Sequence, residues 1–211
     1  MSFWKRSNFV SSSIKFYDYL VNDINCNYAW RCNKTNIFDL YRKNLKPNHL
    51  EIGPGSGYFL LPKHHNKKIE NLYLMDINYP ILNHSHTQLK NHFPNVYPIK
   101  HNIFENSLKF FDFQSVGINY VLHCVPGSLE NKMEKLIENL PNNVSIFGST
   151  VINDYDKQTN LSKLELMFLN KFGIFNNYDD YSNSFIKFVD SNKLNFNTQI
   201  IGNVLIFEIK V

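Results

Sequence analysis

The segment from His49 to Phe59 restricts the possible folds more than any other part of the chain. It begins with a short apolar run that carries Glu51, and it then places glycines at positions 53, 55 and 57. Glycine allows a sharp turn, and it lets a ligand approach the backbone because no Cβ is in the way. A strand that ends in such a turn is typical of nucleotide-binding α/β folds, in which the next helix offers free backbone N–H groups. The sequence therefore predicts a strand, a glycine turn and a helix that begins near residue 57.

The rest of the chain alternates between strand-like and helix-like segments. Short apolar runs predict strands at 49–52, 72–75, 96–99, 116–122 and 144–151. Apolar residues three and four positions apart predict helices at 8–24, 36–45, 57–66, 80–93, 126–140, 160–172 and 179–190. Two β-branched runs, 196–201 and 204–209, are separated by Gly202 and Asn203, which indicates a hairpin. We therefore expect an α/β, Rossmann-like, doubly wound and mostly parallel seven-stranded sheet with a C-terminal antiparallel hairpin.

Composition excludes several other classes of protein. Hydrophobic residues make up 43% of the 211 residues and aromatic residues 15%, which excludes an intrinsically disordered chain. No apolar run reaches about 18 residues, so we expect no membrane span. The net charge of +4 is mild and the 22 Lys and Arg residues are scattered, so we expect no nucleic-acid partner. The three cysteines fit neither a disulfide framework nor a zinc site, and no signal peptide follows Met1, so we expect a cytoplasmic protein with no metal site.

Two carboxylates indicate what the glycine turn binds. A pyrophosphate-binding fingerprint reads G-x-G-x-x-G, whereas this chain reads E-x-G-x-G-x-G. The charge of Glu51 would disfavour pyrophosphate and suit a ligand with a cationic amine. Asp76 ends the second predicted strand, where a carboxylate can accept hydrogen bonds from both hydroxyls of a ribose. The alternative for Asp76 is a structural role as a cap of the following helix.

Two further strand ends carry polar side chains. Asn102 follows the third predicted strand, where it can accept from an adenine amino group while Phe104 packs on the ring; an ordinary loop is the alternative. His123 follows the fourth predicted strand, at the edge where open α/β sheets bind ligands. Its ordinary pKa range suits proton abstraction from a phenol or enol, so it is the candidate catalytic base. The alternative is a buried histidine with a structural role.

The glycine turn, the acid that closes the second strand and the alternating elements resemble the class I S-adenosylmethionine-dependent methyltransferases over roughly residues 35–211. A likeness to a subgroup from microbial and fungal secondary metabolism extends over nearly the whole chain. It rests on the strings 28–32 (YAWRC), 51–60 (EIGPGSGYFL), 119–127 (NYVLHCVPG), 147–150 (FGST) and 173–177 (GIFNN). That subgroup typically has Asp where this chain has Asn102, which keeps an acceptor but loses the charge.

The resemblance implies an S-adenosylmethionine site and a methyl transfer to a small molecule. The cofactor-binding residues that it implies are Tyr17, Trp30, Arg31, Glu51, Gly53, Pro54, Gly55, Gly57, Asp76, Ile77, Asn78, Asn102, Ile103, Phe104, Asn119 and Leu122. Residues 1–34 would form an N-terminal helical lid, in which Arg31 meets the cofactor carboxylate, and residues 35–211 the methyltransferase domain. We expect O-methylation of an aromatic, polyketide-like or carboxylic acceptor by a monomer or homodimer. An NAD-dependent oxidoreductase and a non-catalytic cofactor-binding protein of the same fold are the alternatives.

Overall fold

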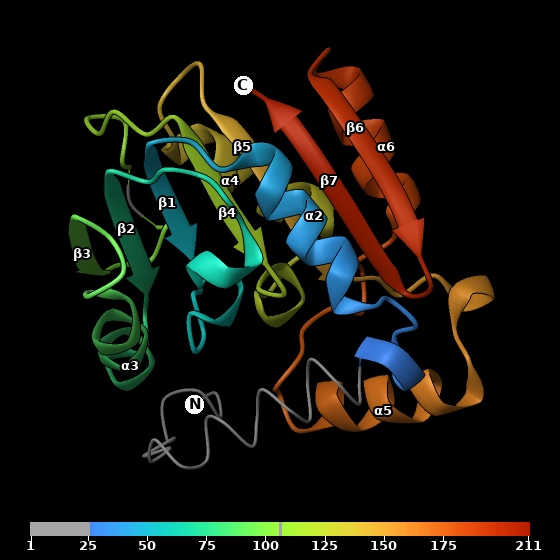
Figure 1. Cartoon of the computed structure of the whole chain (residues 1–211). Helices are drawn as coiled ribbons and strands as arrows, with labels where there is room; N and C mark the ends of the chain where they lie inside the picture. The colour runs from blue at the N-terminus through green and yellow to red at the C-terminus, as the bar shows by residue number, and fades with distance from the viewer. Residues whose placement is uncertain (1–25, 106) are drawn as a thin grey trace.

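The computed structural model describes residues 26–105 and 107–211, and it contains a seven-stranded sheet in the order β3-β2-β1-β4-β5-β7-β6 (Figure 1). The strands are β1 (Asn48–Ile52), β2 (Asn71–Asp76), β3 (Asn95–Lys100), β4 (Ser115–Asn119), β5 (Ser145–Val151), β6 (Asn195–Ile201) and β7 (Val204–Lys210). Neighbouring strands among β1 to β5 are parallel, whereas β7 runs antiparallel to both β5 and β6. The predicted parallel sheet and its C-terminal hairpin are therefore confirmed. The helix predicted at 8–24, which includes Tyr17, lies outside the described residues.

Helices cover both faces of this sheet, as a doubly wound fold requires. They are α2 (Lys34–Asn44), α3 (Tyr79–Leu89), α4 (Leu129–Asn139), α5 (Asn160–Lys171) and α6 (Ser182–Ser191). Side chains of α4 and α6 share one core cluster with Leu50 and Ile52 of β1, and side chains of α2 and α3 form a second cluster with other strand residues. Because successive side chains of a strand point to opposite faces, His49 and Glu51 of β1 lie on the α2 face. In the described part of the chain, no helix has the length and apolar character needed to cross a membrane.

The glycine turn is not followed by the α-helix predicted at 57–66. Two short 3-10 helices stand there instead, η3 (Tyr58–Leu60) and η4 (Pro62–His64). Pro62 is the physical reason, because proline has no N–H to donate and forces the residue before it out of the helical region. Leu61 is accordingly extended, with φ −61° and ψ 133°. The glycine turn therefore leads into a three-residue 3-10 helix and not into an α-helix.

The fourth strand is shorter than predicted. We expected it to reach residue 122, but β4 ends at Asn119, because Tyr120 adopts a left-handed φ of 55° that a strand cannot continue through. The residues Leu122–Cys124 form a 3-10 helix, η5. His123 therefore lies in a helical turn beyond the strand end.

Two helices begin later than predicted, each where a polar side chain caps it. The helix expected from 126 begins at Leu129, because the Ser128 hydroxyl accepts the backbone N–H of Asn131. The helix expected from 179 begins at Ser182, whose backbone N–H donates to the Asp154 carboxylate at 3.0 Å. The Asp154 carboxylate that fixes the start of this second helix lies 28 residues away in the chain, so the local sequence pattern could not predict that start.

Candidate functional site

The glycine turn lies at the carboxyl end of β1, at the edge where parallel α/β sheets bind ligands. Gly53, Gly55 and Gly57 have positive φ angles of 66°, 55° and 81°. A Cβ on Gly53 would overlap Val121, and a Cβ on Gly57 would press on Leu89, so these two glycines allow close packing within the protein. A Cβ on Gly55 would meet no described atom within 4 Å. Gly55 therefore turns bare backbone toward open space, as we expected of a ligand-binding turn.

Asp76 ends the neighbouring strand β2, and its carboxylate is held by the backbone that follows. Its Oδ1 accepts the N–H of Asn78 at 2.7 Å. Burial raises the pKa of Asp76 to about 6, although the backbone N–H groups of Asn78 and Ile77 oppose the shift. Asn78 is 9% exposed and Ile77 is 56% exposed. Asn78 precedes α3, so this bond closes a tight turn before the helix and is not a cap on one of the helix's own N–H groups. The ribose role of Asp76 stays a prediction, which a desolvated carboxylate at this strand end suits.

Glu51 is buried, and its carboxylate is bonded within the protein. Only 2% of Glu51 is exposed. Its Oε1 accepts from the Tyr41 hydroxyl at 2.5 Å, and its Oε2 lies 3.0 Å from His49 Nε2. Gly117 of β4 makes room for this arrangement, because a Cβ there would overlap Glu51 Oε2. We expected the Glu51 carboxylate to contact a ligand amine directly. This geometry does not support that contact, because both carboxylate oxygens already have partners on the α2 face.

The buried polar network continues on both sides of that carboxylate. On one side, His49 Nδ1 lies 2.9 Å from the Ser115 hydroxyl. On the other, Asn119 donates to the Tyr41 hydroxyl at 3.1 Å and accepts from the Ser149 hydroxyl at 3.0 Å. Asn119, which we expected to contact the cofactor, is 7% exposed and committed to this network. The network joins α2, β1, β4 and β5, and it extends along the whole of β4 from Ser115 to Asn119.

We expect Gly117→Ala to lower the free energy of unfolding by about 1–3 kcal/mol, the usual cost of overpacking a tight site. The added Cβ would collide with the Glu51 carboxylate, which Tyr41 and His49 hold in place. Urea unfolding measures the loss. In a Glu51→Ala background the same alanine should cost much less, because the group that it strikes is gone. An equal cost in both backgrounds would contradict this account.

Three residues that we expected to contact the cofactor have structural roles. Asn102 accepts the backbone N–H of Phe104 at 3.1 Å, which closes the turn after β3. Ile103 and Leu122 are 2% and 0% exposed and belong to the core cluster beneath α4. Their side chains are therefore not placed to touch a ligand, whereas the partly buried ring of Phe104 lies at the edge of that cluster.

Trp30 and Arg31 lie beside the turn between β6 and β7. Trp30 is 3% exposed, its ring stacks on Phe175 with centroids 6.0 Å apart, and its carbonyl accepts the N–H of Asn203 at 2.9 Å. Arg31 Nη2 donates to the carbonyl of Lys157 at 2.5 Å. The expected contact between Arg31 and a cofactor carboxylate is not supported, because the guanidinium is bonded to the connection between β5 and α5.

His123 lies buried in an aromatic cluster beyond β4 and β5. Its ring centroid is 4.1 Å from that of Phe175 and 6.3 Å from that of Tyr120. Burial, with a smaller effect of Lys132, lowers the pKa of His123 to about 3, so the ring is neutral. Its Nδ1 accepts the N–H of Val151 at 3.3 Å. A neutral ring that accepts at Nδ1 carries its proton on Nε2, so this tautomer donates a hydrogen bond there and cannot serve as the expected base.

A buried ion pair that the sequence pattern did not predict holds this cluster. Lys132 Nζ of α4 lies 2.6 and 2.8 Å from the two oxygens of Asp180, and the two side chains are 1% and 0% exposed. Lys132 also donates to the carbonyl of Asn176, whose own N–H donates to the His123 carbonyl at 2.7 Å. The pair thus ties α4 to the chain after α5 and to η5. Its signal in the sequence is a lysine on the apolar face of α4.

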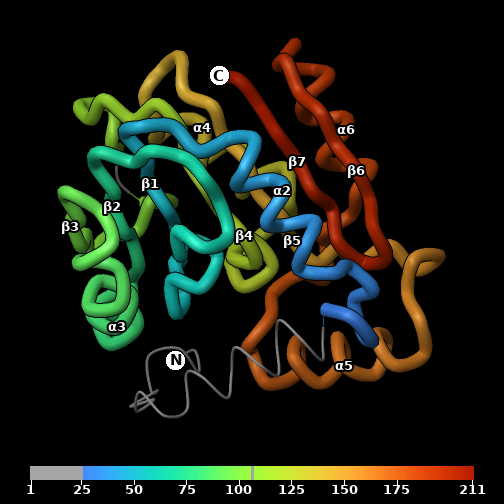
Figure 2. Tube along the Cα trace, viewed as in Figure 1, coloured from blue at the N-terminus to red at the C-terminus, as the bar shows by residue number. Residues whose placement is uncertain are grey.

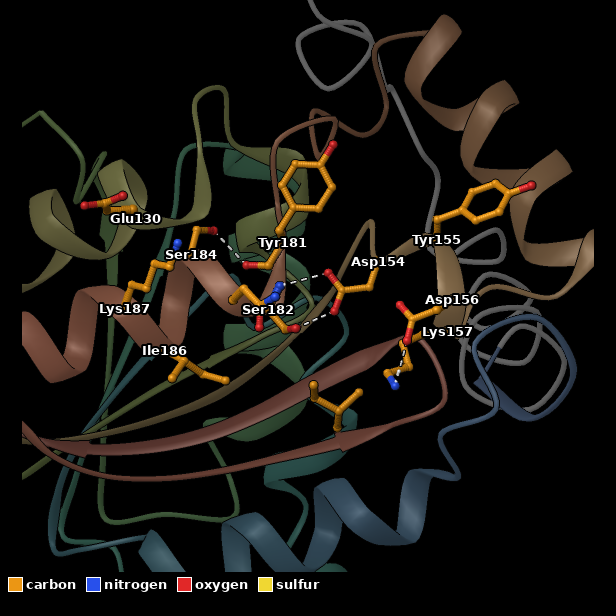
Figure 3. A pocket seen from close by; sticks show the side chains of 12 residues that line it. Glu130, Asp154, Tyr155, Asp156, Lys157, Tyr181, Ser182, Ser184, Ile186 and Lys187 are labelled. Atoms are coloured by element: carbon orange, nitrogen blue, oxygen red, sulfur yellow. Dashed lines mark hydrogen bonds and ion pairs between the residues drawn. The ribbon is translucent and has the colours of Figure 1, made fainter.

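A surface hollow of about 720 Å³ lies elsewhere, between the chain after β5 and the start of α6 (Figure 3). Several of the polar groups around it are already paired with one another. Asp154 accepts from the N–H and hydroxyl of Ser182, and Lys157 pairs with Asp156 at 2.9 Å. The residues that line it include neither the glycine turn nor the ends of β2 and β4. We therefore place the candidate site at the strand ends and not in this hollow.

Comparisons with known proteins agree with the fold. No protein-family model matches the chain. It is similar to methyltransferase aurB of Calcarisporium arbuscula, with 30% identity over 209 residues that cover 91% of this chain and 90% of that protein. It is also 30% identical over 180 residues to demethylluteothin O-methyltransferase of Streptomyces thioluteus, which covers 83% of this chain and 77% of that enzyme.

A solved structure, that of mitomycin 7-O-methyltransferase MmcR, matches all of this chain with a TM-score of 0.64. This chain spans 60% of that one at 12% identity, so the match shows the fold alone. The coverage and identity of aurB, together with the strand order and the glycine turn, show the family. The chain belongs to the class I S-adenosylmethionine-dependent methyltransferases and is similar to members from fungi and Streptomyces.

Proposed function

We propose that this methyltransferase binds S-adenosylmethionine at the ends of β1 and β2 and methylates an oxygen of a small molecule, an aromatic, polyketide-like or carboxylic metabolite. The observation that carries the proposal is the pairing of Gly55 with Asp76. Bare backbone faces open space at one strand end, and a desolvated carboxylate stands at the next. The named relatives, among them O-methyltransferases, support the same chemistry.

These residues fit an amino-acid-tailed nucleoside. We assign the backbone from Gly53 through Pro54 to Gly55 to the amino-acid end of the cofactor, because a side chain at Gly55 would fill the space that it needs. We assign Asp76 to the ribose hydroxyls, and Ile77 and Phe104 to the adenine. Glu51 supports a cationic ligand through its buried charge and not by contact, since it lies two residues before the turn.

S-adenosylmethionine supplies a methyl carbon that its sulfonium has already activated. What the chain must add is alignment of the acceptor and exclusion of water. We propose that the acceptor lies against the aromatic cluster of Trp30, Tyr120, His123 and Phe175. With its proton on Nε2, His123 can donate to the acceptor oxygen and stabilise a negative charge there. This favours an acceptor that arrives already ionised, such as a carboxylate or an acidic enol or phenol, because such an oxygen needs no general base.

A product assay tests the proposal directly. The full chain is incubated with S-adenosylmethionine and a panel of carboxylic, enolic and phenolic acceptors, and S-adenosylhomocysteine and the methylated product are measured by mass spectrometry. We expect turnover with at least one oxygen acceptor. Cofactor binding without turnover on any acceptor would favour the non-catalytic alternative. Failure to bind S-adenosylmethionine or S-adenosylhomocysteine at millimolar concentration would refute the cofactor assignment.

Cofactor affinity should depend on pH through Asp76. Its pKa in the folded protein is raised to about 6, so below that pH the carboxyl is protonated and can no longer accept from both hydroxyls. Affinity for S-adenosylhomocysteine should therefore be full above pH 7 and about tenfold weaker at pH 5, one unit below the pKa. Titration calorimetry across this range measures it. Asp76→Asn, which cannot ionise, should bind weakly with no such slope; an equal slope in the variant would assign the effect to another group.

A further inference from the structure

The string 173–177 (GIFNN), in the connection between α5 and α6, contacts the chain around His123. Figure 2 shows this connection, in orange, as it returns from the end of α5 toward the sheet. The backbone N–H of Asn176 donates to the His123 carbonyl at 2.7 Å, and its side chain donates to the Cys124 carbonyl at 3.1 Å. The ring of Phe175 packs on that of His123, with centroids 4.1 Å apart. The string therefore lies directly against the histidine that we assign to the acceptor.

Asn177 makes a second set of contacts, and it is fully buried. Its exposed fraction is 0%, and both ends of its amide are paired. Its Oδ1 accepts from Asn170 of α5 at 2.8 Å, and its Nδ2 donates to the carbonyl of Val151, the last residue of β5, at 3.1 Å. Burying an amide costs free energy that an apolar side chain of similar size would not incur. What the amide adds at this position is therefore the direction of its hydrogen bonds.

Val151 depends on side chains for its partners because β4 ends too early to pair with it. The parallel pairing of β4 with β5 stops at Asn119 and Ser149. Two residues further along β5, the carbonyl of Val151 accepts from Asn177, and its N–H donates to His123 Nδ1 at 3.3 Å. Side chains thus replace the missing strand, since buried backbone groups require partners. Asn177 and His123 are thereby joined through one residue.

This arrangement fixes the proton of the His123 ring. Its Nδ1 accepts from Val151, and the Thr150 hydroxyl lies 3.5 Å from the same nitrogen. A neutral ring that accepts at Nδ1 carries its proton on Nε2. In the part of the chain that the structure describes, no residue is hydrogen-bonded to Nε2. The Nε2–H group of this ring is therefore available to a ligand.

We propose that Asn177 is a positioning residue for methyl transfer: by holding Val151, it keeps the His123 ring oriented so that Nε2–H reaches the acceptor oxygen. The inference rests on the proposed function, in which that oxygen receives the methyl group. Asn177 has no hydrogen bond to the ring itself, so its effect passes through the end of β5. Without its amide, the Val151 carbonyl would be left unpaired in a buried site, and the strand end would shift to recover a partner. The ring would then lose the fixed bond that selects its tautomer.

Nitrogen NMR of the full-length chain with isotope-labelled histidine tests the proposal without an activity assay, because the ring nitrogens report which of them carries the proton. The variants are Asn177→Leu, which is similar in size, and Asn177→Ala in case the leucine prevents folding; His123→Gln identifies the signal. The matched control is Asn153→Leu. The Asn153 side chain donates to the Tyr178 carbonyl at 2.8 Å in the same connection, but it has no bond to Val151 or His123. Circular dichroism confirms that each variant folds.

In the wild-type chain we expect one neutral His123 tautomer at neutral pH, with its proton on Nε2, because burial lowers the pKa of His123 to about 3. Both Asn177 variants should show a second population that is protonated on Nδ1, whereas Asn153→Leu should not. With the fastest acceptor of the panel, kcat of the Asn177 variants should fall by about tenfold, because a misplaced donor stabilises the reacting oxygen less well. Their affinity for S-adenosylhomocysteine should stay unchanged. A loss of stability alone would not shift the tautomer.

A wild-type ring protonated on Nδ1 would overturn the proposal, and so would a tautomer that stays unchanged in both Asn177 variants. The same shift in Asn153→Leu would overturn it too, because the effect would then be a general loosening of the connection. A shifted tautomer with unchanged kcat would remove the role in methyl transfer. Failure of the proposed function looks different: no acceptor is methylated, yet a tautomer that shifts only in the Asn177 variants confirms that Asn177 holds the ring.

Discussion

Replacing Asp180 with alanine should lower the free energy of unfolding by about 3–5 kcal/mol, the largest stability loss that we expect from one substitution at a polar residue. The variant leaves the Lys132 ammonium 1% exposed and without its counter-ion. It also loosens the chain from Asn176 onward, which holds the backbone of His123. Urea unfolding at neutral pH measures the change.

Two controls distinguish this effect from a general sensitivity to lost ion pairs. Asp156→Ala removes the partner of Lys157 in an exposed pair and should have almost no effect, because solvent screens such pairs. The double variant Lys132→Met, Asp180→Leu replaces both charges with apolar groups and should recover most of the loss. If Asp180→Ala were as mild as Asp156→Ala, the buried pair would not be contributing as a charged pair.

Gly55→Val should abolish measurable binding of S-adenosylhomocysteine, with affinity reduced by about a hundredfold or more. Two effects combine: the side chain fills the open space in front of the turn, and its branched Cβ disfavours a φ of 55°. Titration calorimetry measures the affinity, and thermal unfolding shows whether the fold survives.

Gly173→Val is the matched control for the backbone effect. Gly173 has a similar φ of 67°, and a Cβ there also meets no described atom within 4 Å. The two variants should lose similar stability, but only Gly55→Val should lose the ligand. Normal affinity in Gly55→Val would move the amino-acid end of the cofactor away from this turn.

Periodicity and turn residues were sufficient to predict the sheet, because each parallel strand is a short apolar run with a clear break after it. They also located Gly55 and Asp76, since both follow directly from where a strand ends. These sequence signals could not predict which groups the Glu51 carboxylate would contact. That carboxylate is bonded to Tyr41 of α2, ten residues earlier, and it occupies the space left by Gly117, which lies much further along the chain.

The roles of the remaining site residues depended on similar distant contacts. His123 was located near the correct strand end, but its tautomer is set by the backbone N–H of Val151 on the neighbouring strand. Arg31 was expected at the cofactor, but the carbonyl of Lys157 engages it. Local sequence gives residue type and approximate position, whereas the atom that a side chain bonds is decided by tertiary neighbours.

The break at Pro62 bears on how this protein discriminates among nucleotides. Dinucleotide folds hold their diphosphate on the positive end of the helix that follows the glycine turn. Here 3-10 turns take the place of that helix, and the buried charge of Glu51 lies close beneath. A diphosphate at this turn would meet only the weak dipole of a three-residue 3-10 helix, so we expect NAD and ATP to bind here more weakly than at a turn that opens an α-helix.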